Sequence, residues 1–210
     1  MNHIVLLGDS IFDNAAYVPG GPPLIAQLRS MLPEGWQATL VAMDGSVTSG
    51  VITQIDRLPV CATHLIVSAG GNDGLSRAGI LQMPVASVGA AIEQLAALRA
   101  EFQRNYQKML QALQSKGKPF AICTVYDPCF PDSWTQLVTK TALNIFNDCI
   151  LREGITRGLP VLDLRLICSE GTDYANPIEP GVPGGQKIAA AILELVRSHD
   201  FSSGRTVVYC

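Results

Sequence analysis

The sequence predicts an α/β domain whose parallel sheet is covered by helices on both faces. Strand-like and helix-like segments alternate about five times along the 210 residues, with no internal repeat and no low-complexity linker between them. The composition, 48% hydrophobic and 16% charged, supplies enough apolar surface to exclude a disordered chain. The length fits one domain spanning residues 1–210.

The expected strands are short apolar runs that end at turn residues. They cover His3–Leu7, Ala38–Ala42, His64–Ala69, Phe120–Val125 and Pro160–Leu162. The tail Thr206–Tyr209 is a candidate edge strand.

The expected helices have apolar residues at helical spacing and are bounded by Pro or Gly. They cover Leu24–Leu32, a long amphipathic segment from Val88 to Leu113, Leu137–Leu151 and Gln186–Arg197. In the long segment the apolar residues recur at steps of three and four, which predicts a core-facing stripe.

Charge and hydropathy exclude several partner classes. A formal charge of −3 and a pI near 5.6 argue against binding to nucleic acid or to an acidic membrane, because both need a basic face. No apolar run approaches the ~18 residues of a membrane span. The N-terminal apolar stretch is too short for a signal peptide, so a cytoplasmic location is expected.

The six cysteines do not have the spacing of a structural zinc site. They contain no C-x-x-C pair and have no histidine at metal-ligand spacing, so no metal is expected. Buried reduced thiols are the ordinary interpretation for a chain of this size. A disulfide between Cys123 and Cys129, which flank a Pro-containing loop, stays open.

Polar and glycine-rich motifs follow the first three expected strands. They are Gly8-Asp9-Ser10, Asp44-Gly45-Ser46 and Gly70-Gly71-Asn72-Asp73. Each alone has the composition of a turn. The carboxyl ends of parallel strands meet at one edge, where ligands bind, so the three motifs converge there. A serine hydroxyl, a glycine N–H and an asparagine amide together supply a nucleophile with two oxyanion donors.

On these motifs the chain resembles the SGNH (or GDSL) hydrolases, from residue 3 to about residue 195. The resemblance implies a three-layer α/β/α sandwich with a five-stranded parallel sheet of order 2-1-3-4-5. It also implies a serine hydrolase that cleaves carboxylic esters through an acyl-enzyme on Ser10, without a cofactor. Ser10, Gly45 and Asn72 are then the expected oxyanion-hole residues.

The chain departs from this family in its last motif. The family carries Asp-x-x-His-Pro shortly before its final helix, with the histidine as general base. His3 and His64 begin strands, at the edge opposite Ser10, and His199 follows the last helix. None of these histidines is expected to reach the nucleophile.

Two alignments of residues 173–189 with that motif are possible. If Asp173 matches the family aspartate, Asn176 stands in place of the histidine and three extra residues precede the helix. If the count runs back from the helix start, Glu179-Pro180 matches His-Pro and Asn176 matches the aspartate. The second alignment needs no insertion and is preferred.

The preferred alignment makes Glu179 the base, oriented by Asn176. The ordinary pKa of a glutamate is ~4.3, against ~6.5 for histidine, so it is a poorer base at neutral pH unless a dry pocket raises its pKa. A carboxylate also becomes neutral on taking the proton, which removes the cation that would help hold an oxyanion. Slow ester hydrolysis is expected.

Three further residues are candidates for substrate contact. Asp13, like its neighbour Asn14, either caps a helical turn or touches substrate. Tyr126 and Trp134 lie on or near the loop after the fourth strand and either line an acyl or aryl pocket or cover the core.

A competing function is a non-catalytic relative that binds an acyl, lipid or acetylated-sugar ligand. A nucleotide- or flavin-binding domain is disfavoured, because the first strand is followed by neither Gly-x-Gly-x-x-Gly nor a P-loop. The expected partner is a small-molecule ester, and the sequence sets neither its acyl length nor the oligomeric state.

Overall fold

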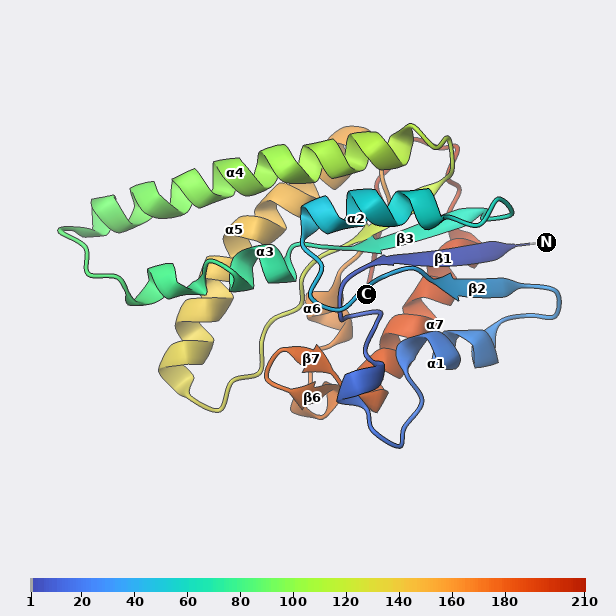
Figure 1. The fold of residues 1–210 in the computed structure, drawn as a ribbon, viewed down its shortest axis with the longest axis horizontal. Helices are drawn as coiled ribbons and strands as arrows, with labels where there is room; N and C mark the ends of the chain where they lie inside the picture. Colours follow the sequence, from blue (N-terminus) through green and yellow to red (C-terminus); the bar gives the residue numbers. More distant parts are fainter. Residues whose placement is uncertain (1) are drawn as a thin grey trace.

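The computed structural model describes residues 2–210 and contains a central sheet of six parallel strands (Figure 1). In spatial order the strands are β2 (Gln37–Leu40), β1 (His3–Gly8), β3 (His64–Ser68), β4 (Phe120–Cys123), β5 (Val161–Leu162) and β8 (Val208–Tyr209). The order 2-1-3-4-5 is confirmed, but a sheet of five strands is one too few. The tail supplies the sixth, with Val208 beside Val161.

Helices cover both faces of this sheet (Figure 1). One layer contains α1 (Leu24–Met31) and α7 (Val182–Ser198), and the other contains α2 (Thr48–Gln54), α4 (Val88–Gln114) and α5 (Ser133–Arg157). Successive side chains of β1 point to opposite faces of the sheet, so the strand contributes to two separate hydrophobic clusters. Ile4 and Leu6 join the cluster with α1 and α7, whereas Val5 and Leu7 join the cluster with α4 and α5.

The long helix α4 departs from the expected core packing in its first half. Its second half is buried, through Phe102, Tyr106, Met109 and Leu113. Its first residue, Val88, is 77% exposed, because this half of the helix extends beyond the sheet (Figure 1, left). The periodic stripe is continuous along the helix, but the sheet supports only part of it.

Two helix starts lie earlier than the sequence indicates. Asp132 caps α5, since its side chain accepts the Thr135 N–H, so the helix begins four residues before Leu137. Pro183 in the first turn of α7 allows that helix to begin before Gln186. The short helices α2, α3 (Gly71–Leu75), α6 (Leu164–Ile167) and η3 (Ala78–Gln82) are not expected from periodicity.

A small antiparallel hairpin lies below the carboxyl ends of the strands and precedes α7 (Figure 1). It consists of β6 (Tyr174–Asn176) and β7 (Glu179–Pro180). The side-chain amide of Asn14 donates to the Pro180 carbonyl at 3.4 Å, and the Tyr126 hydroxyl donates to the Ile178 carbonyl. These contacts attach the hairpin to the segments that follow β1 and β4.

Two further findings concern the described residues 2–210. No helix among them is long and apolar enough to cross a membrane. All six cysteines are free thiols, Cys123 and Cys129 included.

Candidate active site

The nucleophile candidate Ser10 lies in a tight turn at the carboxyl end of β1. Gly8 has φ +133°, and a Cβ there would lie 1.8 Å from the Ser68 carbonyl oxygen, so only glycine fits between β1 and β3. Gln54 holds both backbone groups of Gly8: its Oε1 accepts the Gly8 N–H and its Nε2 donates to the Gly8 carbonyl, each at 2.8 Å. The end of the strand is therefore rigidly placed.

Ser10 and Glu179 meet although 169 residues separate them in the sequence. The Ser10 hydroxyl donates to Glu179 Oε1 at 2.9 Å, and each residue is 6% exposed. The second carboxylate oxygen, Oε2, is buried without a hydrogen-bond partner. A buried acceptor without a donor is costly to keep unless a ligand or water supplies one.

The environment of Glu179 brings its carboxyl group into the range needed for a base at neutral pH. Burial raises its pKa to about 7, the Ser10 hydrogen bond opposes that shift, and the negative charge of Asp44 adds to it. Glu179 therefore exists in both protonation states near pH 7. A general base functions best with such a pKa.

A second buried carboxyl group, Asp9, lies next to the nucleophile. Burial raises its pKa to about 7, the Ile11 N–H opposes the shift, and the charges of Glu179 and Asp73 increase it. Its Oδ1 accepts the Ile11 N–H at 3.3 Å, and its carbonyl accepts the N–H groups of Phe12 and Asp13. Within residues 10–13 only the Ser10 N–H has no acceptor in the protein.

Asn72 lies on the first turn of α3, directly after β3. Its Nδ2 donates to the Ser46 carbonyl at 3.1 Å, which uses one of its two N–H groups and orients the amide. Gly70 precedes it with φ +125°, where a Cβ would lie 3.1 Å from the Phe102 ring. Ser10 and Asn72 line the same cavity.

Gly45 is placed differently from the other two oxyanion candidates. It has φ +75° in a turn closed by the hydrogen bond from the Ser46 N–H to the Met43 carbonyl, at 3.1 Å. It does not line the cavity that contains Ser10 and Asn72.

The structure does not bring Asn176 or Asp173 to Ser10. The Asn176 side chain is exposed and accepts the Ile178 N–H at 2.9 Å, which closes the hairpin turn and leaves Glu179 without an orienting amide. Asp173 is fully buried, but it accepts from Lys187 Nζ at 2.9 Å and from the Glu170 N–H at 3.0 Å. Both residues brace the hairpin and the start of α7.

The three substrate-contact candidates lie at different distances from the cavity. Tyr126 is buried and lines it. Asp13 lies outside the lining and accepts the Asp44 N–H at 3.0 Å. Trp134 is 57% exposed on α5, also outside the lining.

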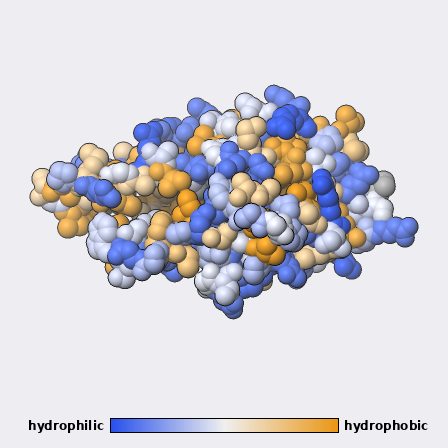
Figure 2. All heavy atoms as spheres, turned by 60° about the horizontal axis from the view of Figure 1, so that its bottom comes forward, coloured by the Kyte–Doolittle hydropathy of each residue, from blue (hydrophilic) through white to orange (hydrophobic). Residues whose placement is uncertain are grey.

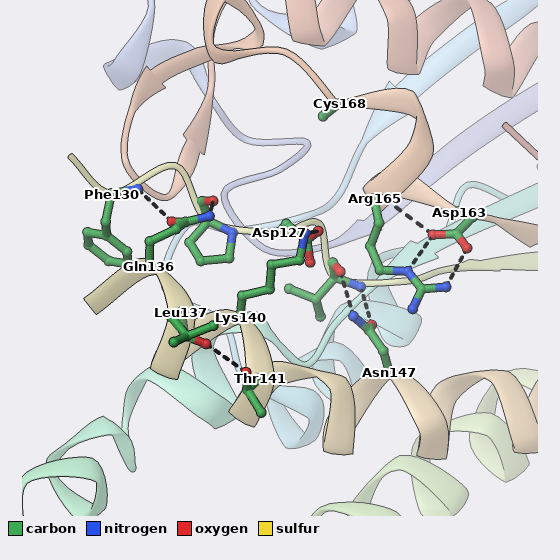
Figure 3. A network of polar contacts seen from close by, with 12 residues as sticks. Asp127, Phe130, Gln136, Leu137, Lys140, Thr141, Asn147, Asp163, Arg165 and Cys168 are labelled. Atoms are coloured by element: carbon green, nitrogen blue, oxygen red, sulfur yellow. Dashed lines mark hydrogen bonds and ion pairs between the residues drawn. The ribbon is translucent and has the colours of Figure 1, made fainter. Parts of the chain in front are cut away.

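The loop that carries Tyr126 is held by polar contacts (Figure 3). Asn147 reaches from α5 to both backbone groups of Val125, each at 2.8 Å. Lys140 pairs with Asp127 at 2.6 Å. Tyr126 therefore lies between a residue whose backbone is held by Asn147 and a residue whose side chain is held by Lys140.

A cavity of about 130 Å³ opens beside Ser10. Its lining is mostly apolar and comes largely from α3, η3, α4 and α5, and its polar members include Asp9, Ser10, Asn72, Arg77 and Glu179. Within residues 2–210 no group of three or more His, Cys, Asp or Glu side chains is arranged to hold a metal ion. The arrangement supplies a hydroxyl, an adjacent base and hydrogen-bond donors in a mostly apolar pocket.

Two residues support the site in ways that the sequence does not predict. Gln54 clamps Gly8, and its Nε2 also approaches Ser46 Oγ at 3.1 Å, but a glutamine in a helix gives no sequence signal of this role. Asn14 accepts the Leu24 N–H at 2.8 Å while donating to Pro180, so it ties the Ser10 segment to the hairpin. The sequence predicts Asn14 only as a helix cap or a substrate contact, not as a link to the hairpin.

Comparison with solved structures identifies similar folds at low sequence identity. A lipolytic protein of the G-D-S-L family from Veillonella parvula is 17% identical, with a TM-score of 0.70 over 95% of this chain and 100% of the other. Phospholipase A1 from Streptomyces albidoflavus is 16% identical, with a TM-score of 0.65 over 95% and 99%. A carbohydrate acetylesterase from Sinorhizobium meliloti is 11% identical, with a TM-score of 0.68 over 94% and 99%.

Sequence comparisons add nothing to this, since no protein-family model and no curated protein matches the chain. The similar structures cover nearly the whole chain and carry names of ester-cleaving enzymes. The chain therefore has the fold of the GDSL (SGNH) hydrolases.

Proposed function

We propose that this protein is a carboxylic ester hydrolase in which Glu179 acts directly as the base for Ser10. The observation that carries the proposal is the 2.9 Å hydrogen bond from the Ser10 hydroxyl to Glu179, inside a cavity that also contains Asn72. The GDSL fold supports an ester substrate at the level of reaction class.

In the acylation half, the Glu179 carboxylate takes the hydroxyl proton while Ser10 Oγ attacks the ester carbonyl carbon. The carbonyl oxygen becomes an oxyanion, for which the Ser10 N–H and the second N–H of Asn72 are the available donors. The tetrahedral intermediate then collapses, and the neutral Glu179 acid returns its proton to the departing alcohol.

In the deacylation half, Glu179 takes a proton from water, which attacks the acyl-Ser10 carbonyl carbon. Collapse of the second tetrahedral intermediate breaks the bond to Ser10 Oγ, which regains a proton from Glu179. The unpartnered Oε2 of Glu179 supports this half, because it is a buried acceptor available to a water molecule.

The Glu179 base also sets the charge of the intermediate. After proton transfer the site contains an oxyanion and a neutral acid, whereas a histidine base would contribute a cation. Hydrogen-bond donors alone then stabilise the oxyanion, so turnover is expected to be slow.

The test is hydrolysis of p-nitrophenyl butyrate between pH 5 and 9. Ser10→Ala is expected to abolish turnover, and Glu179→Gln is expected to lower kcat/KM by about 10²-fold or more. The wild-type rate should rise with pH through about 7, as the Glu179 carboxylate forms. Glu170→Gln is the matched control, since Glu170 is an exposed acid in the same region.

A binding protein without turnover is the competing function, favoured by the position of all three histidines away from Ser10. If the wild type matches Ser10→Ala at every pH and an alkyl phosphonate does not label Ser10, the esterase proposal is wrong. If Glu179→Gln is as active as Glu170→Gln, the protein is still an esterase, but Glu179 is not its base.

A further inference from the structure

We infer that the cavity beside Ser10 is an acyl-chain site, and that it selects an apolar chain of about six carbons over acetyl. This rests on the proposed function. It concerns the part of the substrate for which neither the sequence nor the fold gives a size.

The cavity wall is built from aliphatic and aromatic side chains of three separate segments. Its apolar members include Ile80 and Leu81 from η3, Leu95 and Leu98 from α4, and Leu143 and Phe146 from α5. No side chain with a full charge lines it away from the Ser10 end except Arg77, whose guanidinium pairs with exposed Glu101 at 3.0 Å. Such a wall favours hydrocarbon over the hydroxyl-rich surface of a sugar.

The size of the cavity sets the length of chain that it can cover. Its volume is about 130 Å³. A protein cavity of about 150 Å³ accepts benzene, which has six carbons. The methyl group of an acetyl ester would leave most of this wall without a contact, whereas a hexanoyl chain would fill it.

The apolar surface at this site is only partly covered within residues 2–210. Leu95 and Leu98 belong to the half of α4 that extends beyond the sheet, and both remain partly exposed. Hydrophobic residues also gather at this end of the molecule (Figure 2, left), where Met83, Val85 and Val88 are exposed. A bound chain would complete the packing that the sheet provides for the rest of α4.

The polar groups show which part of the ester enters the cavity. Ser10, Asn72 and Glu179 lie at one end, so the ester carbonyl is placed there with the chain extending between η3 and α5. The alcohol must leave and be replaced by water, so it needs a route to solvent. Asp44 acts on Glu179 through its charge and accepts from the exposed Tyr17 hydroxyl at 2.8 Å, which makes that side polar and open.

The first experiment measures kcat/KM for p-nitrophenyl esters from acetyl to dodecanoyl. Each methylene that enters the cavity is worth about fourfold, so the value should rise on the order of 100-fold from acetyl to hexanoyl. Beyond about six carbons the cavity is full, and the gain per methylene should disappear.

The second experiment reduces the cavity from within. Ala142 lines it from α5, and Ala142→Phe should lower the ratio of hexanoyl to acetyl kcat/KM by at least tenfold. Asn144→Phe, two residues along the same helix on its exposed side, is the matched control and should leave the ratio within twofold. Labelling of Ser10 by a methyl phosphonate reports whether each variant is folded.

The outcomes separate this inference from the function on which it depends. If kcat/KM is the same for all esters from acetyl to dodecanoyl and turnover exceeds that of Ser10→Ala, the acyl-chain site is wrong and the esterase proposal stands. If kcat/KM rises with chain length but Ala142→Phe and Asn144→Phe change the ratio of hexanoyl to acetyl equally, the chain does not bind in this cavity. Absence of both hydrolysis and phosphonate labelling in the wild type overturns the proposed function, and the acyl-chain site with it.

Discussion

The amino ends of the sheet strands form one edge of the sheet and their carboxyl ends form the opposite edge. These amino and carboxyl edges differ in their titratable groups and in what those groups contact. At the amino edge, His3 Nε2 lies 2.8 Å from Thr39 Oγ1 and His64 Nδ1 lies 2.9 Å from Thr63 Oγ1. His199 packs edge-on against Phe201, with ring centroids 4.9 Å apart. At the carboxyl edge Ser10 contacts Glu179, and none of His3, His64 and His199 lies at this edge.

The length of the strands explains why the histidines cannot serve Ser10. A six-residue strand at ~3.3 Å per residue separates the two edges by roughly 20 Å, so His3 and Ser10 lie at opposite ends of β1. Burial lowers the pKa of His3 and His64 and raises the pKa of Glu179. A glutamate in the right place thus acquires a pKa near that of an ordinary histidine.

The largest expected effect comes from exchanging the base itself. Glu179→Gln removes the acceptor and should lower kcat/KM by about 10²–10⁴-fold. Glu179→His should retain at least tenfold more activity than Glu179→Gln, because imidazole also accepts a proton, with an inflection nearer ~6.5. The pH–rate profiles of both variants check this. Equal activity in the two would mean that a proton acceptor at this position is not required.

Removal of the side-chain oxyanion donor is expected to have the next largest effect. Asn72→Ala should lower kcat by about 10²-fold with little change in KM, because the amide acts on the charge that develops in the transition state. Asn144→Ala is the exposed control. A variant in which KM rises and kcat is retained would place Asn72 in ground-state binding instead.

The two edges should contribute to stability with opposite pH slopes. The pKa values of Glu179 and Asp9 are raised to about 7, so the folded state binds more protons than the unfolded state between about pH 4.5 and 7. Their contribution to the free energy of unfolding therefore falls as pH rises through that window. The lowered pKa values of His3 and His64 act in the opposite direction, since the unfolded state then binds more protons.

Urea denaturation at pH 5 and pH 8 measures this difference. Glu179→Gln and Asp9→Asn should each stabilise the protein at pH 8 by about 1–3 kcal/mol relative to wild type, and much less at pH 5. Equal effects at the two pH values would show that neither carboxyl group has a raised pKa in the folded protein.

The smallest effect on activity is expected at the amino edge. A variant with His3→Gln, His64→Gln and His199→Gln should retain kcat/KM within about twofold, because these side chains lie a strand length from Ser10. Its free energy of unfolding should fall by about 1–2 kcal/mol through the lost contacts to Thr39 and Thr63. A tenfold loss of kcat/KM in the folded variant would show that at least one of these histidines is needed for activity.

Much of the fold is predictable because its signals are local. Runs of apolar residues mark β1, β3 and β4, followed by glycine after the first two and by Asp127-Pro128 after β4, and the alternation of strands and helices specifies the parallel sheet. The hydrophobic stripe of α4 specifies a helix, but its burial depends on how far the sheet extends beneath it. The two-residue pairing of β5 with β8 likewise depends on where the chain end lies in space.

The candidate site also combines features that follow from local sequence signals with features that depend on tertiary contacts. The sequence alone places Ser10 and Asn72 shortly after a strand and two residues after a glycine, Gly8 or Gly70, because the positive φ of these turns is a local signal that favours glycine. Only the tertiary structure decides that Glu179, and not Asn176 or Asp173, meets Ser10, since the hairpin that presents it is held by contacts from distant segments. The raised pKa of Glu179 and the volume of the cavity are also tertiary properties, because both arise from burial by side chains far away in the sequence.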